Sequence, residues 1–107
     1  MNNSEVAHNW AHDNYNRNGE LNGSNMYALK SNRTIYSYGS HFPIARKTDS
    51  PTFPVLMTYR GYSNSTGKHI THVWRSLSYR TVFMCHSPSD SPQGIYRREM
   101  TQDVPDK

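Results

Sequence analysis

The strongest hydrophobic pattern in the chain lies within residues 62–79. Four apolar side chains recur there at spacings of three and four positions: Ile70, Val73, Trp74 and Leu77. This spacing places them on one face of an α-helix. Serine and threonine residues precede the pattern and can cap the free N–H groups of the first turn. The sequence therefore predicts a central amphipathic helix whose apolar face packs on a core.

The first 25 residues predict a short helix followed by a loop. Residues 3–12 have apolar side chains at helical spacing, and Asn2 and Glu5 have the spacing of a capping box. Residues 13–25 contain five asparagines and two glycines and show no hydrophobic period. These residue types favour turns, so this stretch is predicted to be a loop.

Five segments have the composition of β-strands. Residues 26–30 and 34–38 are separated by three polar residues and predict either a hairpin or two strands joined by a bend. Residues 53–60 alternate between two faces, residues 81–85 form a short apolar run, and residues 95–98 carry charges that suit an edge strand. The prediction is an α+β fold: a small, largely antiparallel sheet with one central amphipathic helix and a short N-terminal helix.

The 107 residues are enough for one small domain. We expect residues 1–86 to form a single basic α+β domain. Residues 87–107 are rich in Ser and Pro at first, and we expect them to form a linker, an edge strand and a flexible tail. Only 34% of the residues are hydrophobic, so the core is small and a homodimer would be a natural way to stabilise it.

The positive charge is concentrated in the middle of the chain. Residues 26–86 hold eight Lys and Arg residues and a single acid, Asp49, whereas the two flanks together are acidic. A strongly basic domain suits a polyanionic partner, such as nucleic acid or a host nucleoprotein complex. The alternative is a domain that is basic only for solubility.

One face of the predicted central helix combines cations, an imidazole and a phenol. These side chains fall in a narrow stripe opposite the apolar face. Hydroxyls and free N–H groups at the helix start also attract anions. We expect the lysine and arginines to contact phosphate, the histidine to add a pH-dependent contact, and the tyrosines to stack or anchor. The predicted partner-binding residues are Arg60, Tyr62, Ser65, Thr66, Lys68, His72, Arg75 and Tyr79.

Tyrosines are interleaved with the cations of the same segment: Tyr36, Tyr38, Tyr59, Tyr62 and Tyr79. At a protein surface, tyrosine rings can stack on bases while Lys and Arg hold the phosphates. Tyrosine is equally common in strands for packing reasons and at protein–protein interfaces as an anchor. Both a nucleic acid and a host protein are therefore consistent with this pattern.

The residues needed for catalysis are sparse. Asp49 is the only carboxylate of residues 26–86, whereas two-metal nucleases and glycosidases use several. No Gly-x-Ser-x-Gly elbow marks a nucleophilic serine. His41, His69 and His72 are weak candidates for a metal site, but no Cys-x-x-Cys accompanies them. We predict a non-enzymatic protein with no cofactor and no metal, and keep a metal-assisted nuclease as the alternative.

The sequence predicts a soluble protein of the host cytoplasm without a membrane partner. Cys85 is the only cysteine, so no intramolecular disulfide can form, which is consistent with a reducing compartment. No apolar stretch approaches the length of a membrane span, and the N-terminus lacks the charged and apolar regions of a signal peptide.

Three blocks of sequence carry a resemblance. They read Val-Ala-His-Asn-Trp-Ala at residues 6–11, Tyr-Ser-Tyr-Gly-Ser-His-Phe-Pro-Ile-Ala-Arg at residues 36–46, and Tyr-Ser-Asn-Ser-Thr-Gly-Lys-His at residues 62–69. Together they resemble a family of small proteins of unknown function from bacteriophages and other mobile elements. The resemblance implies a phage or plasmid origin and no particular reaction.

Small basic phage proteins typically work by binding nucleic acid or a host machine such as a CRISPR effector. We therefore expect a binding protein that engages nucleic acid or a host nucleoprotein, and one natural version is an inhibitor of a bacterial defence complex of the CRISPR type, an anti-CRISPR candidate. A structural or assembly protein of the virion is a further alternative, which stable self-association would reveal.

Overall fold

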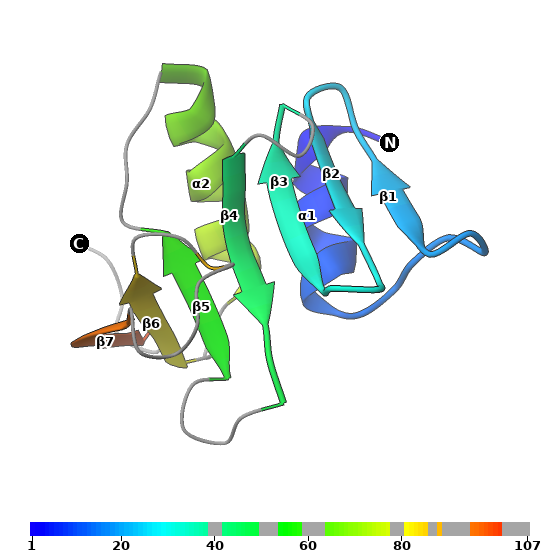
Figure 1. Ribbon diagram of the computed structural model, residues 1–107. Coiled ribbons are helices and arrows are strands. Elements are labelled where there is room, and N and C mark those ends of the chain that lie inside the picture. Colours follow the sequence, from blue (N-terminus) through cyan, green and yellow to red (C-terminus); the bar gives the residue numbers. More distant parts are fainter. Residues whose placement is uncertain are drawn as a thin grey trace.

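Two helices lie side by side on one face of a β-sheet (Figure 1). The computed structural model describes residues 1–38, 42–49, 54–58, 64–77, 81–85, 88 and 95–101. The helices are α1 (Asn3–Ala11) and α2 (Asn64–Ser76). The strands are β1 (Glu20–Asn22), β2 (Met26–Leu29), β3 (Thr34–Ser37), β4 (Phe42–Lys47), β5 (Val55–Thr58), β6 (Thr81–Cys85) and β7 (Ile95–Thr101).

Within the described ranges, seven strands form one sheet and lie in it in chain order. Five neighbouring pairs are antiparallel, and β5 and β6 are parallel. A parallel pair needs a crossover connection, and the segment between these two strands contains α2. The prediction of an α+β fold is therefore confirmed, with a mixed sheet that is mostly antiparallel.

The predicted loop at residues 13–25 is wrong in its second half, because β1 lies there. Leu21 is the single apolar side chain of that strand; it pairs with Ala28 of β2 and is fully buried in the core. A period of two cannot be seen in a strand of three residues. The strand is recognised only from its pairing with β2 and the burial of Leu21 in the core.

Local signals place α1 as predicted. The Asn2 side chain accepts a hydrogen bond from the Glu5 backbone N–H, and the Glu5 carboxylate accepts one from the Asn2 N–H, both at 2.8 Å. This is the reciprocal capping box. The buried face of α1 consists of Val6, Ala7, Trp10 and Ala11.

The buried face of α2 differs from the predicted one. Val73 and Leu77 are buried as expected, but Ile70 and Trp74 are only half-buried at the edge of the core. His69 takes the inward position one turn before Val73. The helix is thus rotated about its axis relative to the prediction, because polar partners for the His69 ring lie beneath it.

Both described helices are short, at nine and 13 residues. A bilayer span needs about 20 apolar residues. Neither helix has the length and hydropathy that crossing a membrane would require.

Candidate nucleic-acid interface

The basic surplus of the domain divides into cations that the fold uses internally and cations at the surface. Lys47 is the clearest internal one, with 6% of its surface exposed. Its ammonium group lies 2.8 Å from the Ala11 carbonyl oxygen, 3.3 Å from that of Trp10 and 2.9 Å from the Asp13 carboxylate. The last carbonyls of a helix have no intrahelical donor, so Lys47 satisfies the C-terminal end of α1.

Two arginines also make contacts within the fold. Arg33 forms an ion pair with Asp49, and its backbone carbonyl accepts a hydrogen bond of 2.9 Å from the Trp10 indole N–H. The Arg46 guanidinium donates to the Pro88 carbonyl oxygen at 2.6 Å. These contacts reduce the positive charge that the domain can offer to a partner.

The outward side of α2 presents its cations to solvent. Lys68 and Arg75 are exposed, and His72 between them is half-buried. Seven positions in a helix correspond to about 10 Å along its axis and to nearly the same face. No residue of α2 is acidic. We call Lys68, His72 and Arg75 the α2 face.

The remaining predicted binding residues are only partly placed. Ser65 and Thr66 belong to the first turn of α2, where backbone N–H groups lack intrahelical acceptors. Arg60, Tyr62 and Tyr79 lie outside the described residues. The part of the site that the structure brings together is therefore α2 itself.

His69 is buried, and its ring contacts polar groups of two other elements. It is 4% exposed, its Nδ1 lies 2.7 Å from the Ser37 hydroxyl, and its Nε2 lies 3.4 Å from the Asn3 amide nitrogen. Burial lowers its pKa below the usual 6.5, and the nearby His72 lowers it further. Both ring nitrogens have polar partners within the fold, and a metal site that includes His69 and His72 stays an untested prediction.

His41, the third weak metal candidate, lies outside the described residues. Among the residues whose positions are described, no three His, Cys, Asp or Glu side chains are grouped closely enough to hold a metal ion.

The hydrogen bonds of Asn3 indicate which ring nitrogen of His69 carries the proton. Asn3 Oδ1 accepts from the Asn25 backbone N–H at 3.1 Å, so the amide NH2 faces the imidazole. An amide nitrogen only donates, so His69 Nε2 accepts and Nδ1–H donates to Ser37 Oγ. The ring is thus neutral and joins three elements, namely α1, β3 and α2.

The contact between Ser37 and His69 is structural rather than nucleophilic. Ser37 is fully buried, so a substrate has no access to its hydroxyl. The group on the far side of the imidazole is an amide rather than a carboxylate. An activated serine needs an accessible oxygen and an oriented base, and the first condition fails.

Among the interleaved tyrosines, the structure separates one buried ring from one exposed ring. Tyr36 is 8% exposed, stacks on Tyr27 with 5.1 Å between ring centroids, and receives a hydrogen bond from Asn32. Tyr38 is 43% exposed, and its ring centroid lies 5.4 Å from that of His69. Tyr38 therefore borders the start of α2.

Sequence reasoning named Tyr38 among the interleaved tyrosines but did not include it in the predicted partner-binding residues. Its backbone φ is +58°, an uncommon left-handed conformation for a bulky residue. Nothing in the alternation of β3 predicts that Tyr36 is covered and Tyr38 is not. The one available signal is the position of Tyr38 directly before Gly39, where the strand ends.

Comparison with known proteins provides no relative for this chain. No family model, no curated protein and no solved structure matches it. The resemblance to small phage proteins therefore stays a prediction.

Proposed function

We propose that this protein is a non-catalytic binding protein that engages nucleic acid, alone or within a host nucleoprotein, through the α2 face. The observation that carries the proposal is the division of the cations. Lys47 is buried inside the fold, whereas Lys68 and Arg75 are exposed two turns apart on a helix without acids.

The physical basis is the attraction between this face and a phosphate backbone. Lys68 and Arg75 can each neutralise one phosphate, and His72 can add a third contact when it is protonated. For two or three contacts on a single strand, the logarithm of the binding constant should fall with the logarithm of the salt concentration with a slope of about −1.4 to −2.1. This slope predicts a modest and salt-sensitive affinity.

The finer identity of the partner follows only from the sequence resemblance. A phage or plasmid protein with this face would act on nucleic acid or a nucleoprotein in the host cytoplasm, and a defence complex of the CRISPR type is the natural target. Inhibition of such a complex is thus the specific form of the proposal.

The test is a titration of labelled single- and double-stranded DNA and RNA with the purified protein over a salt series. The double variant Lys68→Ala/Arg75→Ala should bind about tenfold more weakly or worse and show a salt slope smaller by about 1.4, with an unchanged melting temperature. The matched control is Arg17→Ala/Lys30→Ala, which removes two exposed cations outside α2.

An equal loss in both double variants would mean that only net charge matters and that the α2 face is not the site. Absence of any binding by the unaltered protein at low salt would contradict direct nucleic-acid binding. Stable self-association without binding would favour the virion assembly alternative.

A further inference from the structure

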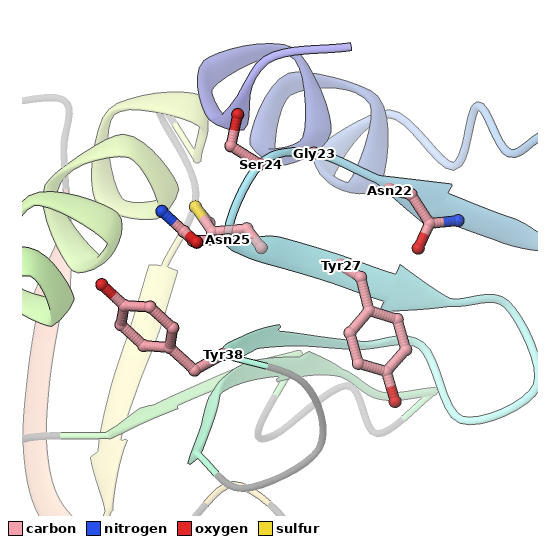
Figure 2. Close-up of a pocket in the computed structure, with 7 residues that line it drawn as sticks. Asn22, Gly23, Ser24, Asn25, Tyr27 and Tyr38 are labelled. Atoms are coloured by element: carbon pink, nitrogen blue, oxygen red, sulfur yellow. The ribbon is translucent and has the colours of Figure 1, made fainter.

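A small cleft opens beside the start of α2, between the turn that joins β1 to β2 and the end of β3 (Figure 2). Its volume is about 260 Å³. Sites for drug-sized ligands occupy about 300–1,000 Å³, so this cleft suits one planar ring. The lining residues are Asn22, Gly23, Ser24, Asn25, Met26, Tyr27 and Tyr38, all of them uncharged.

We propose that this cleft receives one unpaired base of a single-stranded nucleic acid, whose backbone then runs along the α2 face. The inference rests on the proposed function and adds a substrate class to it, namely single strands rather than duplexes. Bases in a duplex are stacked and paired, and their faces are not available for insertion into a cleft.

Tyr38 provides the stacking surface. Its ring is exposed, and its backbone N–H donates to the Asn25 carbonyl oxygen at 2.7 Å. On the α2 side, the His69 ring packs against it at a tilt of 48°. A left-handed backbone at a bulky residue is a strained arrangement that the surrounding structure must hold in place. A ring held in this way loses little freedom when a base stacks on it.

Polar groups at both ends of the cleft can read the edge of a base. Figure 2 shows the Asn25 amide near the Tyr38 end and the Asn22 amide near the Tyr27 end. The Asn22 NH2 group donates to Glu20, which leaves its carbonyl oxygen for a ligand. Within the described residues, the Asn25 side chain makes no hydrogen bond. Amides offer both a donor and an acceptor, as base edges do.

The rim of the cleft is held rigidly against α1. A Cβ atom on Gly23 would approach Asn3 Oδ1 to 2.7 Å and Val6 Cγ2 to 2.9 Å, so only glycine permits this turn to lie so close to the helix. Asn3 also accepts from the Asn25 N–H and contacts His69. One asparagine therefore fixes the rim of the cleft relative to α2.

The cleft and the α2 face are neighbours. Tyr38 contacts the ring of His69, and Lys68 is the residue directly before His69. Lys68 is exposed. A strand with one base against Tyr38 can thus place a neighbouring phosphate near Lys68. An aromatic platform beside a basic track is the usual arrangement of single-strand binding proteins.

The experiment compares a 12-nucleotide single strand with a hairpin duplex of the same composition, using the full chain. Tyr38→Ala should weaken single-strand binding by about 5- to 100-fold, since one stacked base contributes that much, and should leave duplex binding unchanged. Tyr38→Phe keeps the ring and should retain the affinity. Asn25→Ala should produce a smaller loss of the same kind.

The salt dependence separates this inference from the proposed function. Stacking is not electrostatic, so Tyr38→Ala should lower the affinity at every salt concentration without changing the slope. Lys68→Ala/Arg75→Ala should change the slope. An unaltered single-strand affinity in Tyr38→Ala would contradict base insertion into the cleft, but it would not contradict binding through the α2 face.

A measurement on the unaltered protein covers the case in which Tyr38→Ala fails to fold. A 12-unit abasic oligonucleotide keeps the phosphates but has no bases, and it should bind more weakly than the normal strand by the same factor as Tyr38→Ala. Equal affinity for the two oligonucleotides, or an equal loss on single strand and duplex in the variant, would contradict base insertion. No binding of any oligonucleotide would contradict base insertion and direct nucleic-acid binding together.

Discussion

Lys47 and Lys68 are the same residue type in one small domain, and the fold uses them in opposite ways. Lys47 is buried at the C-terminal end of α1, where two carbonyls and the Asp13 carboxylate surround its ammonium group. Lys68 projects from α2 into solvent. The comparison teaches that a count of basic residues overestimates the charge that a partner can meet.

The difference arises from where each lysine meets a helix. The end of a helix carries carbonyls without donors, and burial of that end against the sheet requires a cation or N–H group to satisfy them. The side of a helix has no such unsatisfied groups. A lysine there stabilises little and is available for binding.

The largest expected effect is on the buried lysine. Lys47→Met keeps the length of the side chain but removes the ammonium donor of the Ala11 carbonyl and the ion pair with Asp13; the Trp10 carbonyl keeps its hydrogen bond of 3.2 Å from the Asp13 N–H. We expect the free energy of unfolding to fall by about 3 kcal/mol, because a buried acceptor is left unpaired and an ion pair is lost. Urea denaturation followed by circular dichroism measures this change. Lys68→Met is the matched control and should stay within about 0.5 kcal/mol of the unaltered protein. Similar losses of unfolding free energy in Lys47→Met and Lys68→Met would contradict the different roles of the two lysines.

The next effect concerns the inward side of α2. Removal of the imidazole in His69→Ala eliminates the hydrogen bonds to Ser37 and Asn3 and should cost about 2 kcal/mol at pH 8. The same change should leave the outward charges of α2 in place. Denaturant titrations at fixed pH measure the difference in free energy of unfolding between His69→Ala and the unaltered protein.

His69 also predicts a pH dependence of stability. Its pKa in the folded protein is below 6.5, so the unfolded chain takes up the proton first as the pH falls. Its contribution is complete above pH 6.5 and is lost as the pH falls from there to the folded pKa. The facing groups from α1 and β3, Asn3, Ser37 and Tyr38, are uncharged, and His72 is the neighbouring side chain that also lowers the pKa of His69. His69→Ala should have a flatter profile between pH 7 and 5, and an unchanged profile would contradict the assignment.

A smaller change in stability, of opposite sign, is expected at Tyr15, which is close to the Asp13 partner of Lys47. Tyr15 packs on the core, and its hydroxyl is buried without a hydrogen-bond partner in the described part of the protein. Burial raises its pKa to about 12, with a further increase from Asp13 and a partly opposing effect of Arg33. Tyr15→Phe removes the unsatisfied hydroxyl and should stabilise the protein by about 1 kcal/mol. Destabilisation would show that the hydroxyl has a partner after all.

The smallest effect is expected on the α2 side. Gly67 is an exposed residue of the first turns of α2, and a Cβ there would meet nothing within 4 Å. Gly67→Ala should raise the free energy of unfolding by about 0.5–1 kcal/mol, because alanine loses less entropy in a helix. Oligonucleotide affinity should be unchanged. Gly23→Ala is the contrasting variant, and its clash with Asn3 and Val6 should destabilise the protein. Melting temperatures measured for Gly67→Ala and Gly23→Ala compare the stabilities of the two variants.

Short-range signals made much of the fold predictable. The capping box of Asn2 and Glu5 and the hairpin of β2 and β3 depend on residues close together in the chain, and both are present. The central helix follows from its period. These elements could be read from the sequence because their stabilising contacts lie within a few positions.

Other features depend on partners far away in the chain. Leu21 becomes part of a strand through Ala28 and the core, and the parallel pairing of β5 with β6 depends on how the crossover containing α2 packs. His69 turns inward because Ser37 and Asn3 lie 32 and 66 positions away. No local pattern encodes these contacts.

The candidate site shows the same division. The sequence by itself determined that Lys68, His72 and Arg75 share one side of a helix, since helical periodicity is a local property. Only the tertiary structure decided that Lys47 is consumed inside the fold and that Tyr38 is exposed beside α2. The physical reason is that periodicity fixes the direction of a side chain relative to its own element, whereas burial depends on what packs against that element.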